Sequence, residues 1–161
     1  MWHTDRVQPP KFAKHLRILR AETESPMTQN DRAAAKTILL VEDDDVVRHL
    51  TVEVLHEFGY QVQALRDGPS ALDRLRSDQP FALLMSDIGL PGMDGRELVE
   101  AARRLRPTLP VLFASGYSER ELLEEVRARD TAAATDSIVK PYDFKLLAQR
   151  LNELAGPPSD V

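Results

Sequence analysis

The chain contains no cysteine and no long run of apolar residues. Without cysteine, disulfide frameworks, zinc–thiolate sites, iron–sulfur clusters and cysteine nucleophiles are excluded. The longest apolar runs, such as 38–41 and 81–85, reach about five residues, whereas a membrane-spanning helix needs roughly 20. The N-terminus also lacks the apolar segment of a secretory signal. We therefore expect a cytoplasmic protein with no membrane span.

The counts of 7 glycines and 11 prolines in 161 residues show no collagen-like or low-complexity bias. A composition of 42% hydrophobic and 29% charged residues is typical of a globular protein and excludes a wholly disordered one. The net charge of −5 argues against nucleic acid as the main partner, because phosphate binding needs clustered Lys and Arg. We expect about one domain and no direct DNA binding.

The first part of the chain differs from the rest. Phe12, Leu16 and Leu19 have the spacing of one helical face among basic residues, which is typical of an amphipathic arm that meets a partner or an anionic surface. The alternative is a loose tail, and Met27 also fits a later start that would make residues 1–26 an upstream extension. We expect a flexible N-terminal extension, a folded domain and a tail, at residues 1–35, 36–156 and 157–161.

From Lys36 onward, short apolar runs alternate with amphipathic segments. The predicted strands are Thr37–Val41, Tyr60–Leu65, Phe81–Ser86, Val111–Ala114 and Ser137–Val139. The predicted helices are one capped by Asp45 with Val47, Leu50, Val54 and Phe58 on its inner face, one that follows Asp67, then Arg96–Leu105, Ser118–Arg129, and one capped by Asp143. This alternation predicts an α/β fold, a doubly wound (βα)5 sandwich with a five-stranded parallel sheet covered on both faces.

Polar residues directly follow four of the predicted strands. Glu42 and Asp43 follow the first strand, Asp87 the third, Ser115 the fourth and Lys140 the fifth. A single acid in such a place usually only caps the next helix, but packing alone does not explain the whole set. Ligands of doubly wound folds bind at the carboxyl ends of the strands, so we expect these side chains to form one site.

The chemistry of this set favours a hard cation and a phosphoryl group. Three carboxylates without cysteine or histidine suit Mg²⁺, which prefers oxygen ligands and retains several waters. A metal with open positions, an ammonium group and a hydroxyl can together neutralise phosphoryl oxygens, while a central carboxylate attacks phosphorus and forms an acyl phosphate.

Four segments also carry a family resemblance: Val41-Glu42-Asp43-Asp44, Ser86-Asp87-Ile88-Gly89-Leu90-Pro91-Gly92-Met93-Asp94-Gly95, Phe113-Ala114-Ser115-Gly116-Tyr117 and Val139-Lys140-Pro141-Tyr142. Together they resemble the receiver domain of two-component response regulators, in particular the stand-alone receivers similar to chemotaxis regulators. The resemblance covers residues 36–155 and implies the strand order 2-1-3-4-5.

The resemblance assigns a role to each matching residue. Asp87 is the expected phosphoacceptor and, with Glu42 and Asp43, forms the expected Mg²⁺ site. Asp43 would bind the metal directly, Glu42 would bind it through water, and Ile88 would offer its backbone carbonyl. Asp44 and Asp45 fall outside the acidic pair and are interpreted as acids that favour the start of a helix.

Ser115 matches the switch hydroxyl that closes onto the phosphoryl group, and Lys140 matches the lysine that contacts a phosphoryl oxygen. Pro141 matches a position that follows a cis bond, and Gly116 lies beside the switch residue. Gly89 and Tyr117 occupy places that influence water access to the acyl phosphate. The chain departs from many receivers at Ser137, where an aromatic residue would accompany closure of the switch.

The implied partners are a histidine kinase or histidine phosphotransfer protein and a downstream protein target. A homodimer through the helix 118–129, the strand 137–139 and the last helix is also implied. The sequence after Leu154 is too short for a DNA-binding output domain. We therefore expect a signalling module, which is not an enzyme beyond its own phosphotransfer and autodephosphorylation.

Three other functions remain open at this point. The first is a scaffold of the same fold, in which protein contact and not phosphorylation carries the signal. The second is a phosphatase with an aspartyl nucleophile, which would want an acid where Gly89 stands. The third is a flavin-binding module, which would want a hydroxyl-rich loop after the first strand, whereas residues 42–45 are all acidic.

Overall fold

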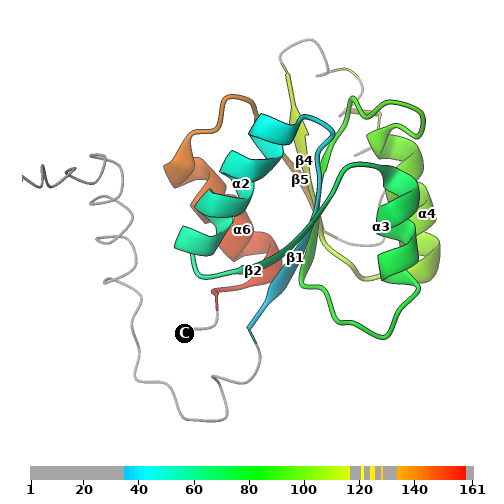
Figure 1. The fold of residues 1–161 in the computed structure, drawn as a ribbon, viewed down its shortest axis with the longest axis horizontal. Coiled ribbons are helices and arrows are strands. Elements are labelled where there is room, and N and C mark those ends of the chain that lie inside the picture. The colour runs from blue at the N-terminus through cyan, green and yellow to red at the C-terminus, as the bar shows by residue number, and fades with distance from the viewer. Residues whose placement is uncertain (1–34, 117–120, 122–123, 126–127, 129–133, 159–161) are drawn as a thin grey trace, which may run out of the picture.

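The computed structural model describes residues 35–116, 121, 124–125, 128 and 134–158 (Figure 1). Within these residues five strands alternate with helices along the chain. The strands are β1 (Thr37–Val41), β2 (Gln61–Leu65), β3 (Leu83–Asp87), β4 (Val111–Ser115) and β5 (Thr135–Val139). The helices are α2 (Asp45–Glu57), α3 (Gly68–Leu75), α4 (Gly95–Leu105) and α6 (Phe144–Ala155).

All five strands are parallel and lie in the order β2-β1-β3-β4-β5. Helices α2 and α6 cover one face of the sheet, and α3 and α4 cover the other (Figure 1). One apolar cluster fills each space between sheet and helices. Leu55 and Leu147 belong to the first cluster, and Leu72 and Leu98 to the second. The predicted doubly wound α/β sandwich and its strand order are therefore confirmed.

Aspartate side chains begin the described helices. Asp44 accepts hydrogen bonds from the backbone N–H groups of Val46 and Val47, both at 2.9 Å, and Asp94 forms a capping box with Glu97. The prediction that Asp45 caps α2 is wrong by one residue. Asp45 lies in the first turn of the helix, where its carboxylate pairs with arginine side chains.

The inner face of α2 also differs from the prediction. Leu50 was expected to point inward, but 55% of its surface is exposed, and Thr51 and Leu55 are the buried residues of this helix. Thr51 tolerates burial because its hydroxyl donates to the carbonyl of Val47 at 2.7 Å. Val54 and Phe58, which were also expected to face inward, are partly buried against the apolar cluster on this side, so the prediction is wrong at Leu50.

Two strands extend further than their apolar residues suggested. Asp87 and Ser115 are the last residues of β3 and β4 and not the first residues beyond them, and both are buried. Strand β5 begins at Thr135, two residues earlier than predicted, because its first residues are polar. Two of the predicted site residues therefore lie on the final positions of strands, while Glu42, Asp43 and Lys140 follow the strands as expected.

Some predictions fall on parts of the chain that the structure does not describe. The N-terminal extension lies outside the described residues except for residue 35, as does most of the predicted helix Ser118–Arg129. Among the residues that are described, no helix has the length and hydrophobicity needed to cross a membrane.

Candidate functional site

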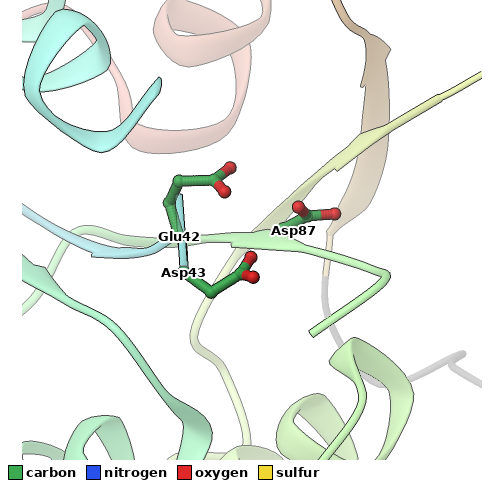
Figure 2. Close-up of side chains that lie close together, drawn as sticks. All are labelled: Glu42, Asp43 and Asp87. Carbon is green, nitrogen blue, oxygen red and sulfur yellow. The ribbon is translucent and has the colours of Figure 1, made fainter. Parts of the chain in front are cut away.

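Three carboxylates meet at the carboxyl end of the sheet. Glu42 and Asp43 follow β1, and Asp87 ends β3, the strand that pairs with β1. One oxygen from each of the three side chains lies within 4.8 Å of the other two, and Figure 2 shows the carboxylates facing a common space. Glu42 and Asp87 are buried while Asp43 is exposed, so the cluster opens to solvent on the Asp43 side.

Lys140 supplies the positive charge of this cluster. Its ammonium group lies 2.8 Å from Asp87 Oδ2 and 3.3 Å from Glu42 Oε2. Burial alone would lower the pKa of Lys140, but the hydrogen bond and charge of Asp87, with those of Glu42, raise that pKa overall. Lys140 therefore stays protonated, and it joins β5 to both acidic strand ends.

Burial has the opposite effect on Glu42. Desolvation raises the pKa of its carboxyl group, while the backbone N–H of Asp44 and the charge of Lys140 lower it less strongly. The Asp44 N–H donates to Glu42 Oε1 at 3.1 Å. Because burial disfavours the charged form of Glu42, a further cation nearby would stabilise that form. The position of Glu42 therefore favours binding of a metal ion.

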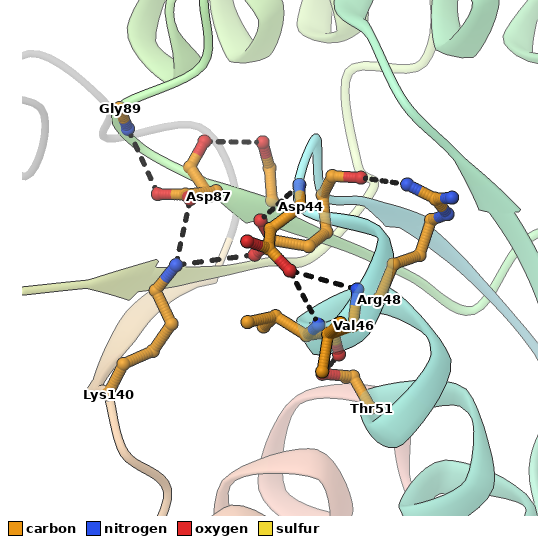
Figure 3. A network of polar contacts seen from close by, with 10 residues as sticks. Asp44, Val46, Arg48, Thr51, Asp87, Gly89 and Lys140 are labelled. Atoms are coloured by element: carbon orange, nitrogen blue, oxygen red, sulfur yellow. Dashed lines mark hydrogen bonds and ion pairs between the residues drawn. The ribbon is translucent and has the colours of Figure 1, made fainter.

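The two carboxylate oxygens of Asp87 have different partners. Lys140 contacts Oδ2, and the backbone N–H of Gly89 donates to Oδ1 at 3.0 Å (Figure 3). Gly89, predicted to control access, thus lies directly against the predicted phosphoacceptor. The Lys140–Pro141 peptide bond is cis, which is the conformation that the resemblance implied.

Ser115 lies between β3 and β5 with its hydroxyl buried. Among the described residues, Ser115 Oγ has no hydrogen-bond partner. Its backbone carbonyl accepts from the N–H of Lys140 at 2.8 Å, so a backbone hydrogen bond joins the two residues that carry the predicted switch hydroxyl and the predicted lysine. The following Gly116 has open space where a Cβ would lie. A buried hydroxyl without a partner is available to bond an oxygen that enters the site.

The predicted roles of Ile88 and Tyr117 are not tested by the structure. The side chain of Ile88 is fully buried, and its carbonyl accepts a hydrogen bond from Gly95 N–H at 3.0 Å, which ties it to the start of α4. Its role as a metal ligand stays a prediction. Tyr117 lies outside the described residues.

Arg48 is part of the site and was missed by sequence reasoning. Its guanidinium group donates to the backbone carbonyl of Glu42 at 3.0 Å (Figure 3) and pairs with Asp45. The available signal was its spacing of three residues from Asp45, but such pairs are common on exposed helices. The bond to a loop carbonyl could not be read from that spacing.

Comparison with known proteins identifies the family. Residues 38–152 match the model of the response regulator receiver domain, which is well over half of the chain. The chain belongs to this family. It is 36% identical to the response regulator receiver protein CpdR of Brucella abortus over 121 residues, covering 74% of this chain and 96% of that protein.

Receivers that form parts of larger proteins match as well. The sensor protein TorS of Escherichia coli is 31% identical over 136 residues, which covers 84% of this chain but only 15% of that protein. A solved receiver domain of a Pseudomonas aeruginosa sensor histidine kinase has 26% identity and a TM-score of 0.66, covering 76% of this chain and 99% of that one. That structure has a magnesium ion coordinated in its active-site cleft.

The family gives the acidic cluster its context. Receiver domains of two-component systems are generally signalling modules without catalytic activity toward other molecules, and they typically bind Mg²⁺ at an acidic pocket. The donor set of Glu42, Asp43 and Asp87 fits that ion, because it consists of carboxylate oxygens that one cation can reach together. Homologues include response regulators and kinase receivers.

Proposed function

We propose that this receiver accepts a phosphoryl group on Asp87 from a phosphohistidine, with Mg²⁺ bound, and signals to a protein partner by a change of conformation. The observation that carries the proposal is the position of Asp87. Its carboxylate lies within reach of two other carboxylates and 2.8 Å from the ammonium group of Lys140. A carboxylate between a metal site and a fixed cation is suited to attack phosphorus.

The proposed step conserves atoms and charge. A carboxylate oxygen of Asp87 attacks phosphorus, a P–O bond forms, and the P–N bond to the imidazole breaks. The released imidazole nitrogen keeps the electron pair of that bond. Lys140 stays on the second carboxylate oxygen or moves to a phosphoryl oxygen, and in both positions it offsets negative charge. When bound at Glu42, Asp43 and Asp87, Mg²⁺ neutralises phosphoryl oxygens.

We further propose that Ser115 forms a hydrogen bond to the phosphoryl group when Asp87 is phosphorylated. Its hydroxyl is buried and lacks a partner among the described residues, so a phosphoryl oxygen on Asp87 would give it one. An unmade buried hydrogen bond is costly, and making it favours the conformation that closes on the phosphoryl group. Gly89, and Tyr117 beyond the described residues, would then set how readily water reaches the acyl phosphate.

The proposed partners are a histidine kinase or histidine phosphotransfer protein and a downstream protein. Val139 at the end of β5 and Leu146 on α6 are large apolar residues that are 40% and 36% exposed, which supports this side as a contact surface for a partner or a second copy. We assign the function to residues 36–156, and the family match over residues 38–152 supports that assignment.

The test is phosphorylation by a small acyl phosphate, followed by intact mass spectrometry. One phosphoryl adduct is expected with Mg²⁺ and none with excess chelator. Asp87→Asn removes the nucleophile and should give no adduct, while Asp94→Asn, which alters a nearby acid that caps α4, should still be phosphorylated. Absence of an adduct both from acyl phosphates and from a panel of phosphorylated histidine kinases would favour the scaffold function.

A further inference from the structure

The loop between β1 and α2 carries two of the three acids of the proposed metal site, and several hydrogen bonds hold it. The Asp44 N–H donates to the side chain of Glu42, and the side chain of Asp44 accepts from the first turn of α2. A further bond comes from Arg48, whose Nη1 donates to the backbone carbonyl of Glu42 at 3.0 Å. That carbonyl belongs to the peptide unit that joins Glu42 to Asp43.

Arg48 is unusually buried for a charged residue near a helix start. Only 15% of its side chain is exposed, whereas 77% of the next residue, His49, is exposed. Its guanidinium group folds back from α2 over the loop, with Nη1 on the Glu42 carbonyl (Figure 3) and Nη2 on Asp45. The rigid fork of a guanidinium group can hold two acceptors at a fixed separation, which a lysine cannot do.

Asp43 depends on this loop for its position. Among the residues that the structure describes, its side chain has no hydrogen-bond or ion-pair partner, and it is exposed. No side-chain contact among the described residues therefore holds its carboxylate, and the backbone sets the point from which the side chain extends. A bond that holds the Glu42–Asp43 peptide unit holds that point and limits the positions that the carboxylate can reach.

We propose that Arg48 is a positioning residue that orients Asp43 toward the metal through the Glu42 carbonyl. The proposal rests on the Mg²⁺ binding proposed above. An alternative role for Arg48 is purely electrostatic, since a positive charge near three carboxylates offsets their repulsion. The two roles predict opposite effects on Mg²⁺ affinity, because removing a nearby positive charge strengthens cation binding and removing a positioning bond weakens it.

The experiment compares Mg²⁺ dissociation constants by isothermal titration calorimetry for the wild-type chain and for Arg48→Met, Arg48→Lys and Arg66→Met. Arg66 is the matched control, because it also pairs with Asp45, at 3.0 Å, but is 68% exposed and has no bond to the loop backbone among the described contacts. Circular dichroism and urea unfolding establish that each variant is folded.

For Arg48→Met we expect the Mg²⁺ dissociation constant to rise by about 10- to 100-fold, as is typical when a group that supports a metal ligand is lost. Arg48→Lys retains the charge but loses the fork, so its constant should also rise, while Arg66→Met should stay within about twofold of the wild type. At saturating Mg²⁺, Arg48→Met should recover phosphorylation by acyl phosphate.

An unchanged or tighter Mg²⁺ constant in Arg48→Met overturns the positioning role and leaves the electrostatic one. An equal loss of affinity in Arg66→Met also overturns it, since Asp45 would then be the important contact. A wild-type chain that binds no Mg²⁺ contradicts the proposed function itself. These outcomes differ, so failure of the inference is distinguishable from failure of the function.

Discussion

The two ends of β1 differ in how their charged side chains are paired. At its carboxyl end, Glu42 and Asp43 lie beside Asp87, and one lysine faces the three acids. At its amino end, the ammonium group of Lys36 donates to the carbonyl of Ala155, the last residue of α6, at 2.8 Å. A cation at a helix C-terminus is favourable because it satisfies a free carbonyl and complements the helix dipole.

The contacts at the amino end of β1 thus stabilise the fold. Tyr60, just before β2, adds a hydrogen bond from its hydroxyl to the carbonyl of Gly156 at 3.0 Å. The Lys36 ammonium group and the Tyr60 hydroxyl thus each have a backbone carbonyl as partner. The carboxyl end instead has three clustered carboxylates, of which two contact a lysine, so negative charge remains in excess there, as expected of a site that binds a cation.

The strongest test of this contrast is Asp43→Asn. Loss of one ligand should raise the Mg²⁺ dissociation constant by at least about 10-fold. Without Mg²⁺ the same variant should be more stable than the wild type, by about 1 kcal/mol, because one of three repelling charges is gone. Calorimetric titration measures the first effect and urea unfolding in chelator the second.

Asp45→Asn is the control for that variant. Asp45 is also an exposed acid near the site, but Arg48 and Arg66 pair with it, and the hydrogen bond from Arg48 followed by the charge of Arg66 lowers the pKa of its carboxyl group. Its neutralisation should bring no stabilisation. If both variants are equally stabilised, the effect is one of overall charge and the carboxyl end has no special repulsion.

Lys140→Met tests the same end with the opposite charge. Removing the only cation that contacts Glu42 and Asp87 among the described residues leaves two buried acids unpaired. We expect a loss of about 2–3 kcal/mol in the free energy of unfolding, less than for a fully buried pair because 25% of Lys140 is exposed. Urea unfolding without Mg²⁺ is the measurement.

A second substitution identifies the cause. In the double variant Glu42→Gln/Lys140→Met one of the two orphaned charges is removed, so part of the lost stability should return. No recovery would mean that Lys140→Met acts through lost packing of the long lysine side chain and not through charge.

The contrast between the ends could be predicted from the sequence only in part. The acids and the lysine were predictable because each interrupts an apolar strand pattern at the same edge of a parallel sheet. That Asp87 and Ser115 still belong to their strands was not, since a strand predicted from apolar residues ends at the last of them. Hydrogen bonding to the neighbouring strand carries β3 and β4 one residue further.

Contacts between distant segments were the least predictable. The bond from Lys36 to Ala155 joins residues 119 positions apart, and no local pattern announces it. The burial of Thr51 on the inner face of α2 was not predicted, because a polar hydroxyl can be buried when it donates a hydrogen bond within its own helix. Arg48 was hidden for a related reason, since its decisive acceptor is a backbone carbonyl and a backbone acceptor is present at every position.

The smallest effect is expected at the amino end, from Tyr60→Phe. At neutral pH the lost hydrogen bond to Gly156 should cost about 1 kcal/mol, and the Mg²⁺ dissociation constant should not change. Burial raises the pKa of the Tyr60 hydroxyl, so the neutral phenol is favoured in the folded state. The stability from this group is complete below pH 10, the ordinary tyrosine value, and is lost as pH rises toward the folded pKa.

As pH rises above 10, the free energy of unfolding should therefore fall less in Tyr60→Phe than in the wild type. The difference in this free energy between the two proteins should shrink to zero or change sign. Urea unfolding of both proteins at pH 8 and pH 11 measures this, and other titrating groups cancel in the difference. A constant gap between the proteins would mean that the phenol ionises equally well folded and unfolded. A changed Mg²⁺ affinity in Tyr60→Phe would instead show that the two ends of the sheet are coupled.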